Sequence, residues 1–422
     1  MHQELTSGVQ FNFENQNKFK NVAISIDFIE PLAEDNLVER TMVAEMMENY
    51  SAKYNSKLKV ARKLAELYGA RFGTNVFKVG DVVALRIVIT FINDQFLGGK
   101  INLIQQICEF LEEMIFHPYL IDGSYPTEPF ELQRDNLVDY LHNLSDNKKY
   151  YAARQTKKMY FANDPMNAKL VFGNVEDLAQ VTPERVANYY HSMLNDDNVY
   201  ISVQGNLAAQ QITTIKNYFN FSARHDLTVG MNENYDHQEI TYKVENAVQK
   251  QSQLDLMYHF PVNLKSDDYY AAIVMNSLLG GSASSLMFLN IREKQSLAYY
   301  ISSSFNSTMG FLMIQSGIDG DQAENVQIMI KQQIQKLIDG DYADSQLEKI
   351  KTSLISGYLT KFDSERKSLN DVFVKALVNN FVTKADWIAS LKSITKADVA
   401  KVAQKLDLQA VFLLKGESNE QN

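Results

Sequence analysis

An arginine and a tyrosine spaced seven residues apart are the side chains in this sequence best suited to holding a carbonyl or carboxylate. Arg292 falls at the end of a short apolar helix, and Tyr299 stands at the entrance of a strand that runs to Phe305. Arginine donates a planar fork of hydrogen bonds, and a tyrosine hydroxyl adds one more. The spacing predicts that Arg292 and Tyr299 together bind a carbonyl or carboxylate through hydrogen bonds. The alternative is that Arg292 pairs with a surface acid while Tyr299 fills a core.

Two glycines precede this helix. Gly280 and Gly281, followed by Ser282, predict a tight turn, which alone is a weak functional signal. Beside Arg292, such a turn can leave a backbone edge open for an extended peptide to add as a strand.

The composition is that of an ordinary globular protein of more than one domain. The chain has 422 residues, 45% of them hydrophobic and 22% charged, and exceeds the size at which single cores stop growing. The net charge of −10, without a compensating basic run, excludes nucleic acid as a partner. The single cysteine, Cys108, lies in an apolar helical pattern and is predicted to be a buried, inert thiol.

The predicted elements occur in the same order twice. In the first half, strands end near Phe28, a helix spans about 36–50, and a strand pair covers 72–77 and 82–92, followed by helices at 101–116 and 128–144. In the second half, a strand at 252–258 and a helix at 267–279 precede a strand pair at 299–306 and 310–318, then helices at 321–338 and 345–361.

The two halves end most alike. A helix that begins after Thr182 leads to a strand stopping at Gly205, and a helix that begins after Thr395 leads to a strand stopping at Gly416. We infer an internal duplication: an α+β fold of two tandem homologous domains, each a mainly antiparallel β-sheet backed by α-helices. The predicted domains are residues 1–225 and 241–422, joined by a polar linker at 226–240.

The order of elements and the motif from Gly280 to Tyr299 resemble the insulinase/pitrilysin-type zinc metallopeptidases. The closest resemblance is to the small bacterial and mitochondrial-processing-peptidase branch, in which two such chains face each other. In that family, an Arg and a Tyr at this spacing hold the substrate beside the metal. The resemblance implies this role for Arg292 and Tyr299, with Gly280 and Gly281 at the same substrate-binding site.

The family's metal motif is missing. An inverted H-x-x-E-H places two imidazoles one turn apart for zinc and a Glu that activates water. Here those positions hold Met42, Glu45 and Met46, and thioethers are poor zinc ligands. The family's third ligand, a Glu on a later helix, aligns with Tyr140, and Gln133 lies seven residues before it. Glu45 is either a relic or a contributor to binding.

No other catalytic pattern replaces that site. No two of the seven histidines lie three to five residues apart, so none forms a local chelating pair. We therefore expect no cofactor in this chain, and zinc only in a partner subunit.

These observations favour a non-catalytic, peptidase-like subunit that pairs with a zinc-bearing homologue. Arg292 and Tyr299 would bind peptide and stabilise the oxyanion in trans. Two alternatives stay open: a structural or peptide-binding homodimer without a part in proteolysis, and an active metallopeptidase with unorthodox ligands. Because neither a secretory signal nor an apolar run of membrane-spanning length is evident, we expect a cytoplasmic protein with no membrane partner.

Overall fold

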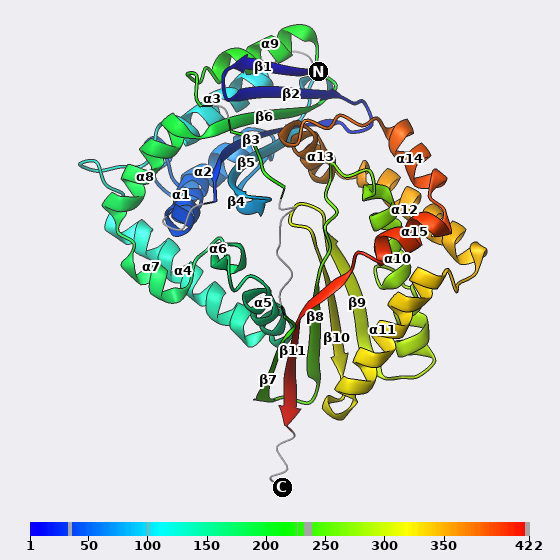
Figure 1. Ribbon diagram of the computed structural model, residues 1–422. Helices are drawn as coiled ribbons and strands as arrows, with labels where there is room; N and C mark the ends of the chain where they lie inside the picture. Colours follow the sequence, from blue (N-terminus) through cyan, green and yellow to red (C-terminus); the bar gives the residue numbers. More distant parts are fainter. Residues whose placement is uncertain (33–35, 99–100, 226, 232–238, 418–422) are drawn as a thin grey trace. The chain divides into compact units, whose positions relative to one another are not determined.

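The computed structural model contains two β-sheets, each packed against helices (Figure 1). It describes residues 1–32, 36–98, 101–225, 227–231 and 239–417. The predicted linker at 226–240 lies partly outside this range, including Asn232, Asn234 and His237. Among the described residues, no helix is both long and apolar enough to cross a membrane.

The first sheet has the strand order β1-β2-β6-β3-β5-β4. All neighbouring strands are antiparallel except β2 and β6, which are parallel. Its strands are β1 (His2–Thr6), β2 (Val9–Asn15), β3 (Asn21–Pro31), β4 (Arg71–Val79), β5 (Val82–Ile92) and β6 (Asn198–Gly205).

The second sheet repeats the same arrangement with one strand fewer. Its order is β7-β11-β8-β10-β9, and only β7 and β11 are parallel. Its strands are β7 (Thr241–Val248), β8 (Ser252–His259), β9 (Ala298–Asn306), β10 (Phe311–Ile318) and β11 (Asp407–Glu417). Strand by strand, β2, β6, β3, β5 and β4 correspond to β7, β11, β8, β10 and β9. The predicted fold class, two homologous α+β domains with mainly antiparallel sheets, is confirmed.

The chain forms two compact units that are not contiguous in sequence. Unit 1 comprises residues 1–141, 170–230 and 361–381, and unit 2 comprises residues 142–169, 231–360 and 382–422. The linker predicted at residues 226–240 separates the two duplicated halves of the sequence, which are not the same as the two compact units. The linker stays a prediction as a domain boundary.

The helices of unit 1 include the one that carries the expected metal motif. They are α1 (Leu37–Asn49), α2 (Lys57–Glu66), η2 (Asp94–Phe96), α3 (Leu103–Phe116), most of α4 (Thr127–Asp146), α7 (Val175–Gln180), α8 (Pro183–Asp196), α9 (Ala209–Tyr218) and α13 (Glu365–Leu377). The predicted helices at 36–50, 101–116 and 128–144 match α1, α3 and α4 to within two residues at each end.

The helices of unit 2 include the turn that carries Arg292. They are α5 (Lys148–Tyr160), α6 (Pro165–Ala168), α10 (Tyr269–Leu279), η3 (Phe288–Glu293), η4 (Gly320–Gln322), α11 (Ala323–Asp339), α12 (Asp344–Lys361), α14 (Lys384–Ser393) and α15 (Lys396–Ala403). One face of the second sheet packs on α10, α11 and α15 through buried aliphatic side chains such as Leu256, Ile314 and Val402.

Each half of the duplicated sequence contributes a helix to the sheet of the other half. Helix α5, from the first half, covers β8 and β11, where Tyr151 packs against Phe412 of β11. Phe161, directly after α5, packs against Phe311 at the start of β10. Helix α13, from the second half, covers β6, β2 and β3. On this face, Phe373 of α13 meets the rings of Tyr200 on β6 and Phe77 on β4 edge-on. The exchange explains why neither unit is a single stretch of sequence.

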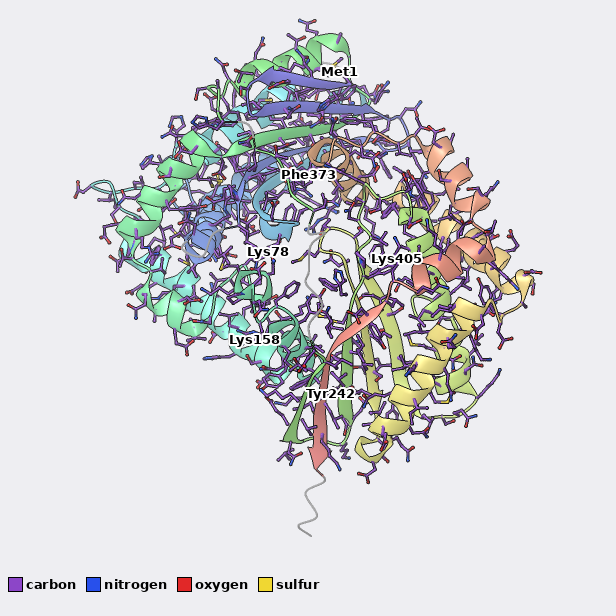
Figure 2. The ribbon with its side chains drawn as sticks, viewed as in Figure 1. Met1, Lys78, Lys158, Tyr242, Phe373 and Lys405 are labelled. Atoms are coloured by element: carbon purple, nitrogen blue, oxygen red, sulfur yellow. The ribbon has the colours of Figure 1, made fainter. Side chains whose placement is uncertain are left out.

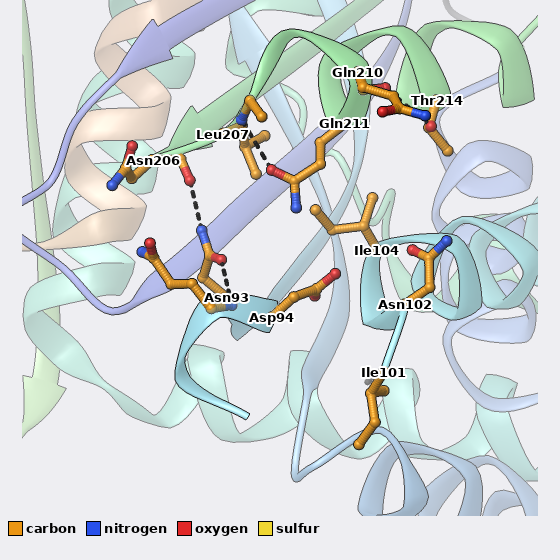
Figure 3. A pocket seen from close by; sticks show the side chains of 12 residues that line it. Asn93, Asp94, Ile101, Asn102, Ile104, Asn206, Leu207, Gln210, Gln211 and Thr214 are labelled. Atoms are coloured by element: carbon orange, nitrogen blue, oxygen red, sulfur yellow. Dashed lines mark hydrogen bonds between the residues drawn. The ribbon is translucent and has the colours of Figure 1, made fainter. Parts of the chain in front are cut away.

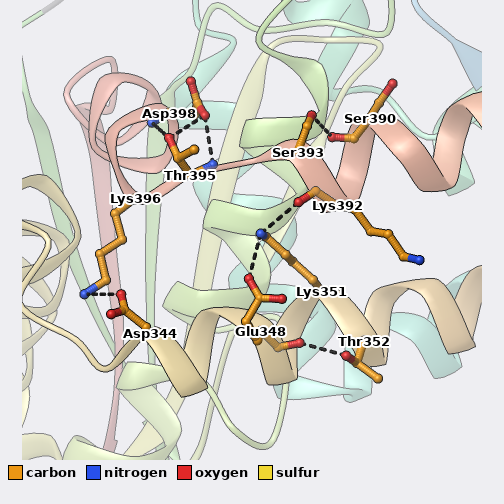
Figure 4. A network of polar contacts seen from close by, with 10 residues as sticks. All are labelled: Asp344, Glu348, Lys351, Thr352, Ser390, Lys392, Ser393, Thr395, Lys396 and Asp398. Carbon is orange, nitrogen blue, oxygen red and sulfur yellow. Dashed lines mark hydrogen bonds and ion pairs between the residues drawn. The ribbon is translucent and has the colours of Figure 1, made fainter.

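A buried lysine fixes a corner of unit 2 (Figure 4). The side chain of Lys351, on α12, is only 7% exposed, and its ammonium donates to Glu348 Oε1 at 2.8 Å and to the Lys392 carbonyl at 3.0 Å. That carbonyl lies in the last turn of α14, whose carbonyls lack partners within the helix. A capping box of Thr395 and Asp398 then begins α15.

Replacing Lys351 by Ala is expected to destabilise the protein by about 1–3 kcal/mol, because the Lys392 carbonyl at the end of α14 loses the charged donor supplied by the buried Lys351 side chain. Chemical denaturation followed by circular dichroism measures the change. Lys349→Ala is the matched control, since Lys349 is exposed on the same helix, and it should stay within about 0.5 kcal/mol of the parent. Equal effects of the two substitutions would contradict this role for Lys351.

Candidate functional site

Arg292 lies in a π-helical turn, η3. The wide turn closes through a hydrogen bond from the Lys294 amide to the Leu289 carbonyl at 3.1 Å, five residues back. The Arg292 side chain is 41% exposed, and its guanidinium lies over the Phe288 ring, 4.7 Å from the ring centroid. Its Nε is 3.9 Å from Glu293 Oε1, too far for a hydrogen bond. The Arg292 guanidinium therefore rests on the Phe288 ring, and its ion pair with Glu293 is weak.

The connection from η3 to the next strand is tightly folded. Ser296 has φ of 52°, a left-handed conformation that costs a residue with a Cβ energy. Its amide donates to the Arg292 carbonyl at 3.1 Å, and the Leu297 amide donates to Ile291 at 3.0 Å. These hydrogen bonds hold the segment between Arg292 and Tyr299 in one conformation.

Tyr299 occupies a β-bulge in β9. The ladder with β10 pairs Tyr300 with Gly317 and Ala298 with Ile318, so Tyr299 has no opposite residue. In a regular strand, Tyr299 would share a face with Ile301 and Ser303, both of which are buried. The bulge gives that place to Ala298 and turns the phenol outward, where it is 67% exposed. The alternative in which Tyr299 fills a core is therefore wrong.

Gly280 allows the end of α10 to lie against β9, and Gly281 allows the chain to fold back on the last turn of α10. The Gly280 carbonyl accepts a hydrogen bond from the Ser303 amide at 3.2 Å. A Cβ on Gly280 would lie 2.8 Å from Ser303 N, and one on Gly281 would lie 2.9 Å from Asn276 Nδ2. The outer edge of β9 is therefore occupied at Ser303. Among the described residues, only β10 pairs with β9 as a strand, so its edge towards Tyr299 is unpaired.

The expected metal positions lie on α1 in unit 1. Met42 and Met46 are fully buried and belong to the apolar core. Glu45 is partly buried, and its pKa is raised, first by desolvation and then by the nearby Glu48. The positive charge of Lys57 opposes this rise. The Lys57 ammonium also donates to Gln133 Oε1 at 3.3 Å.

The second set of expected positions lies on α4. Gln133 is buried and donates to the Tyr50 hydroxyl at 3.3 Å. Tyr140 is half-exposed and meets the ring of Phe172 edge-on, with the ring centroids 5.4 Å apart. Sequence reasoning missed Lys57, because nothing in its local pattern relates it to Gln133 or Glu45.

These side chains do not fit zinc. Two buried thioethers, an amide and a phenol replace the nitrogen and carboxylate donors that zinc prefers, and a lysine ammonium adds positive charge. Within the described part of the chain, no group of three or more His, Cys, Asp or Glu side chains could hold a metal ion. Cys108 is buried as predicted, and burial raises the pKa of its thiol to about 12.

Helix α1 is held in place by a buried arginine. Arg40 donates to Glu30 Oε1 at 3.1 Å, to the Phe28 carbonyl at 3.0 Å and to Asp197 Oδ2 at 2.6 Å. Burial raises the pKa of Asp197 to about 6, although the Arg40 charge opposes this rise. The network links α1 to β3 and to the end of α8.

The described residues of unit 1 line at least two cavities. One, of about 560 Å³, adjoins the edge strand β4 and includes Thr74 and Glu48, whose Oε2 accepts from the Thr74 amide at 2.7 Å. The other, of about 810 Å³, lies beside the first turns of α3 and α9 (Figure 3). Its Asn93 donates to the Asn206 carbonyl at 2.6 Å, and Gln211 accepts from the Ala208 amide at 2.9 Å. These amides satisfy neighbouring backbone, so we assign this cavity no role.

Comparisons with known proteins place this geometry in a family. A crystal structure of a conserved protein from Enterococcus faecalis V583 has a TM-score of 0.93 and 30% identity, covering 100% of this chain and 99% of that one. The probable inactive metalloprotease YmfF of Bacillus subtilis (strain 168) is 26% identical over 97% of this chain and 96% of its own. The model of the peptidase M16 inactive domain matches residues 180–354.

The chain belongs to the peptidase M16 family. This confirms the resemblance to insulinase/pitrilysin-type peptidases, and the chain is an inactive, peptidase-like member. A second relative is named for zinc: the uncharacterized zinc protease YmxG of Bacillus subtilis (strain 168) is 23% identical over 86% of this chain and 85% of its own.

Replacing Glu45 by Gln is expected to raise the melting temperature at neutral pH. A carboxyl whose pKa is raised by folding destabilises the folded state when it is ionised. The penalty is absent below the ordinary pKa of 4.5, grows as the pH rises through the raised pKa, and is constant above it. The gain from Glu45→Gln should therefore be present at pH 7.5 and absent at pH 4.

Glu48→Gln serves as the contrasting variant. The Glu48 carboxylate accepts from the Thr74 amide and hydroxyl, so its neutralisation should lower the melting temperature at pH 7.5. A gain from Glu45→Gln that is equally large at both pH values would contradict this account.

Proposed function

We propose that this chain is a non-catalytic subunit that pairs with a zinc-bearing M16 homologue and binds the peptide substrate in trans through Arg292 and Tyr299. The observation that carries the proposal is the bulge in β9, which turns Tyr299 out of the core on the same folded segment that holds Arg292. Bulges are frequent next to active sites, where they re-aim a side chain.

The two side chains suit different parts of this task. Arg292, with its guanidinium plane supported by Phe288, can present two parallel N–H donors to a peptide carbonyl or carboxylate. Tyr299 offers one hydroxyl donor to an oxygen on which charge develops. Neither group needs to ionise for this role. The metal chemistry belongs to the partner subunit, because α1 lacks the ligands.

The edge of β9 complements this pair. A peptide that enters as an extended strand could pair with the open edge towards Tyr299, while Gly280 closes the edge at Ser303. Main-chain hydrogen bonds would then hold the peptide irrespective of its sequence, beside the Arg292 and Tyr299 donors.

The relatives support a partner of this kind. One organism, Bacillus subtilis (strain 168), has both a relative named a probable inactive metalloprotease and one named a zinc protease. We therefore propose a zinc-bearing M16 chain from the same cell as the partner, in the cytoplasm as the sequence predicts.

The test mixes this chain with its zinc-bearing relative and follows cleavage of a fluorogenic peptide. The mixture should cleave faster than the relative alone. Because an oxyanion donor typically contributes about 10²–10³ in turnover, Arg292→Ala and Tyr299→Phe should each lower kcat of the mixture by about this factor.

Matched controls separate this role from folding. Tyr242→Phe removes an exposed hydroxyl from β7, and Lys294→Ala removes an exposed cation next to Arg292. Both should leave kcat unchanged. If the mixture is no faster than the relative alone, or Arg292→Ala has no effect, the trans role fails and a structural or peptide-binding homodimer takes its place.

A further inference from the structure

The second sheet ends in an exposed edge strand, β7. Among the described residues, β7 pairs only with β11, so one of its edges is open. In Figure 1, β7 lies at the border of this sheet next to β11, and in Figure 2 Tyr242 is labelled on this strand. The opposite border of the same sheet is β9, which carries Tyr299.

This strand exposes apolar side chains as well as backbone. Tyr242, Val244 and Val248 point to one face and are each more than 60% exposed, and Ile240, just before the strand, is 41% exposed. On the other face, Lys243 and Glu245 form an ion pair at 2.6 Å. Long edge strands with exposed apolar side chains are a template for pairing with another chain.

The first sheet shows how this fold covers such an edge. Its strand β2 corresponds to β7, and β1 pairs with β2 antiparallel on the outer side, with Gln3 opposite Phe11. Among the described residues, no strand takes the corresponding place on β7. An added antiparallel strand at this border is therefore an arrangement that the fold already contains.

We propose that a second copy of this chain occupies the edge, β7 against β7, antiparallel about a two-fold axis at Val244. The sequence of β7 is complementary to itself in this register. Val244 faces the partner's Val244, and Lys243 faces the partner's Glu245, so the two-fold creates two opposite-charge pairs. Ile240 faces the partner's Val248, which adds an apolar contact at each end.

The charges favour this occupant over an unrelated strand. In this register, Lys243 and Glu245 of both copies lie on one face and alternate in sign, so each carboxylate lies between two ammonium groups. Any register shifted by one residue loses these charge pairs and moves the side chains to the other face. Because the interface is a single strand pair, the dimer should be reversible and dissociate on dilution.

This inference does not depend on the proposed function. Pairing through β7 uses the border of the sheet opposite β9, so Arg292 and Tyr299 keep their exposure in the dimer. A homodimer through β7 and a zinc-bearing partner at β9 can therefore coexist on one chain.

Cysteine cross-linking of the full chain tests the register. The native Cys108 is buried, so it does not compete. Directly opposite residues of an antiparallel pair have Cα atoms about 4.5–5.5 Å apart, within disulfide range. Val244→Cys should give a disulfide-linked dimer under mild oxidation. Tyr242 is equally exposed, but in this register it lies opposite Asn246 of the second copy and not opposite the second Tyr242. Tyr242→Cys should therefore remain unlinked.

Light scattering over a range of concentrations tests the charges and the apolar contact. Lys243→Glu or Glu245→Lys should each raise the dimer Kd about fivefold or more, and the double reversal should restore it. Val244→Lys should give monomers. Ile328→Lys, a control at a residue 51% exposed on α11, should dimerise like the parent.

Three results would overturn the proposal. They are a parent chain that is monomeric at every concentration, a dimer that Val244→Lys leaves intact, and equal cross-linking of the two cysteine variants. The second would mean that another surface forms the dimer, and the third that β7 does not pair in this register.

Discussion

The central strands of both sheets are buried on their two faces, and this requirement organises the rest of the chain. Eight consecutive residues of β3, from Val22 to Ile29, are buried, as are Ser252 to Tyr258 in β8. An antiparallel sheet commonly leaves one face to solvent, and then its strands alternate between apolar and polar residues. Here each sheet has helices of its own half on one face. A single helix from the other half, α13 or α5, covers the second face.

How firmly the backbone is held differs between the two candidate sites, and this difference determines which side chains are exposed. Helix α1 is fixed by Arg40, whose guanidinium is fully buried and hydrogen-bonded to β3 and to Asp197. The Met42 and Met46 side chains of α1 are therefore buried in the core. A metal ligand at either position would instead have to point out of the core. On β9, by contrast, irregular backbone at Ser296 and Tyr299 carries side chains outward. Arg292 and Tyr299 are therefore exposed, whereas Met42 and Met46, at the expected metal positions, are buried in the core.

Much of the fold could be predicted from the sequence because its periodicity is strong. Helix α3 and strand β5 have clear apolar patterns, and the repeated order of elements indicated the duplication. Helices α5 and α13 were not predicted, since their polar sequences become half-buried only when a distant sheet packs against them. Ser25 and Asp27 interrupt the apolar pattern of β3, and Arg86 on β5 pairs with Asp27 in the same buried layer.

The site was predictable in its residue types but not in its geometry. The motif around Arg292 selected the candidate segment from its residue types, whereas the bulge that exposes Tyr299 depends on the register of β9 against β10. Similarly, the absence of histidines at the motif positions is visible in the sequence, but the hydrogen bond between Lys57 and Gln133 joins residues 76 positions apart and is visible only in the structure. Contacts between elements distant in sequence carry no local signal.

The exchange of helices also has a consequence for biosynthesis. When a ribosome has translated as far as Gly205, all six strands of the first sheet exist, but α13, which begins at Glu365, has not yet been made. The nascent chain must therefore carry an uncovered apolar sheet surface until α13, which begins at Glu365, has been translated. Exposed surfaces of this kind are what chaperones bind during folding. Folding of the first sheet can therefore be completed only after α13, near the end of the chain, has emerged from the ribosome.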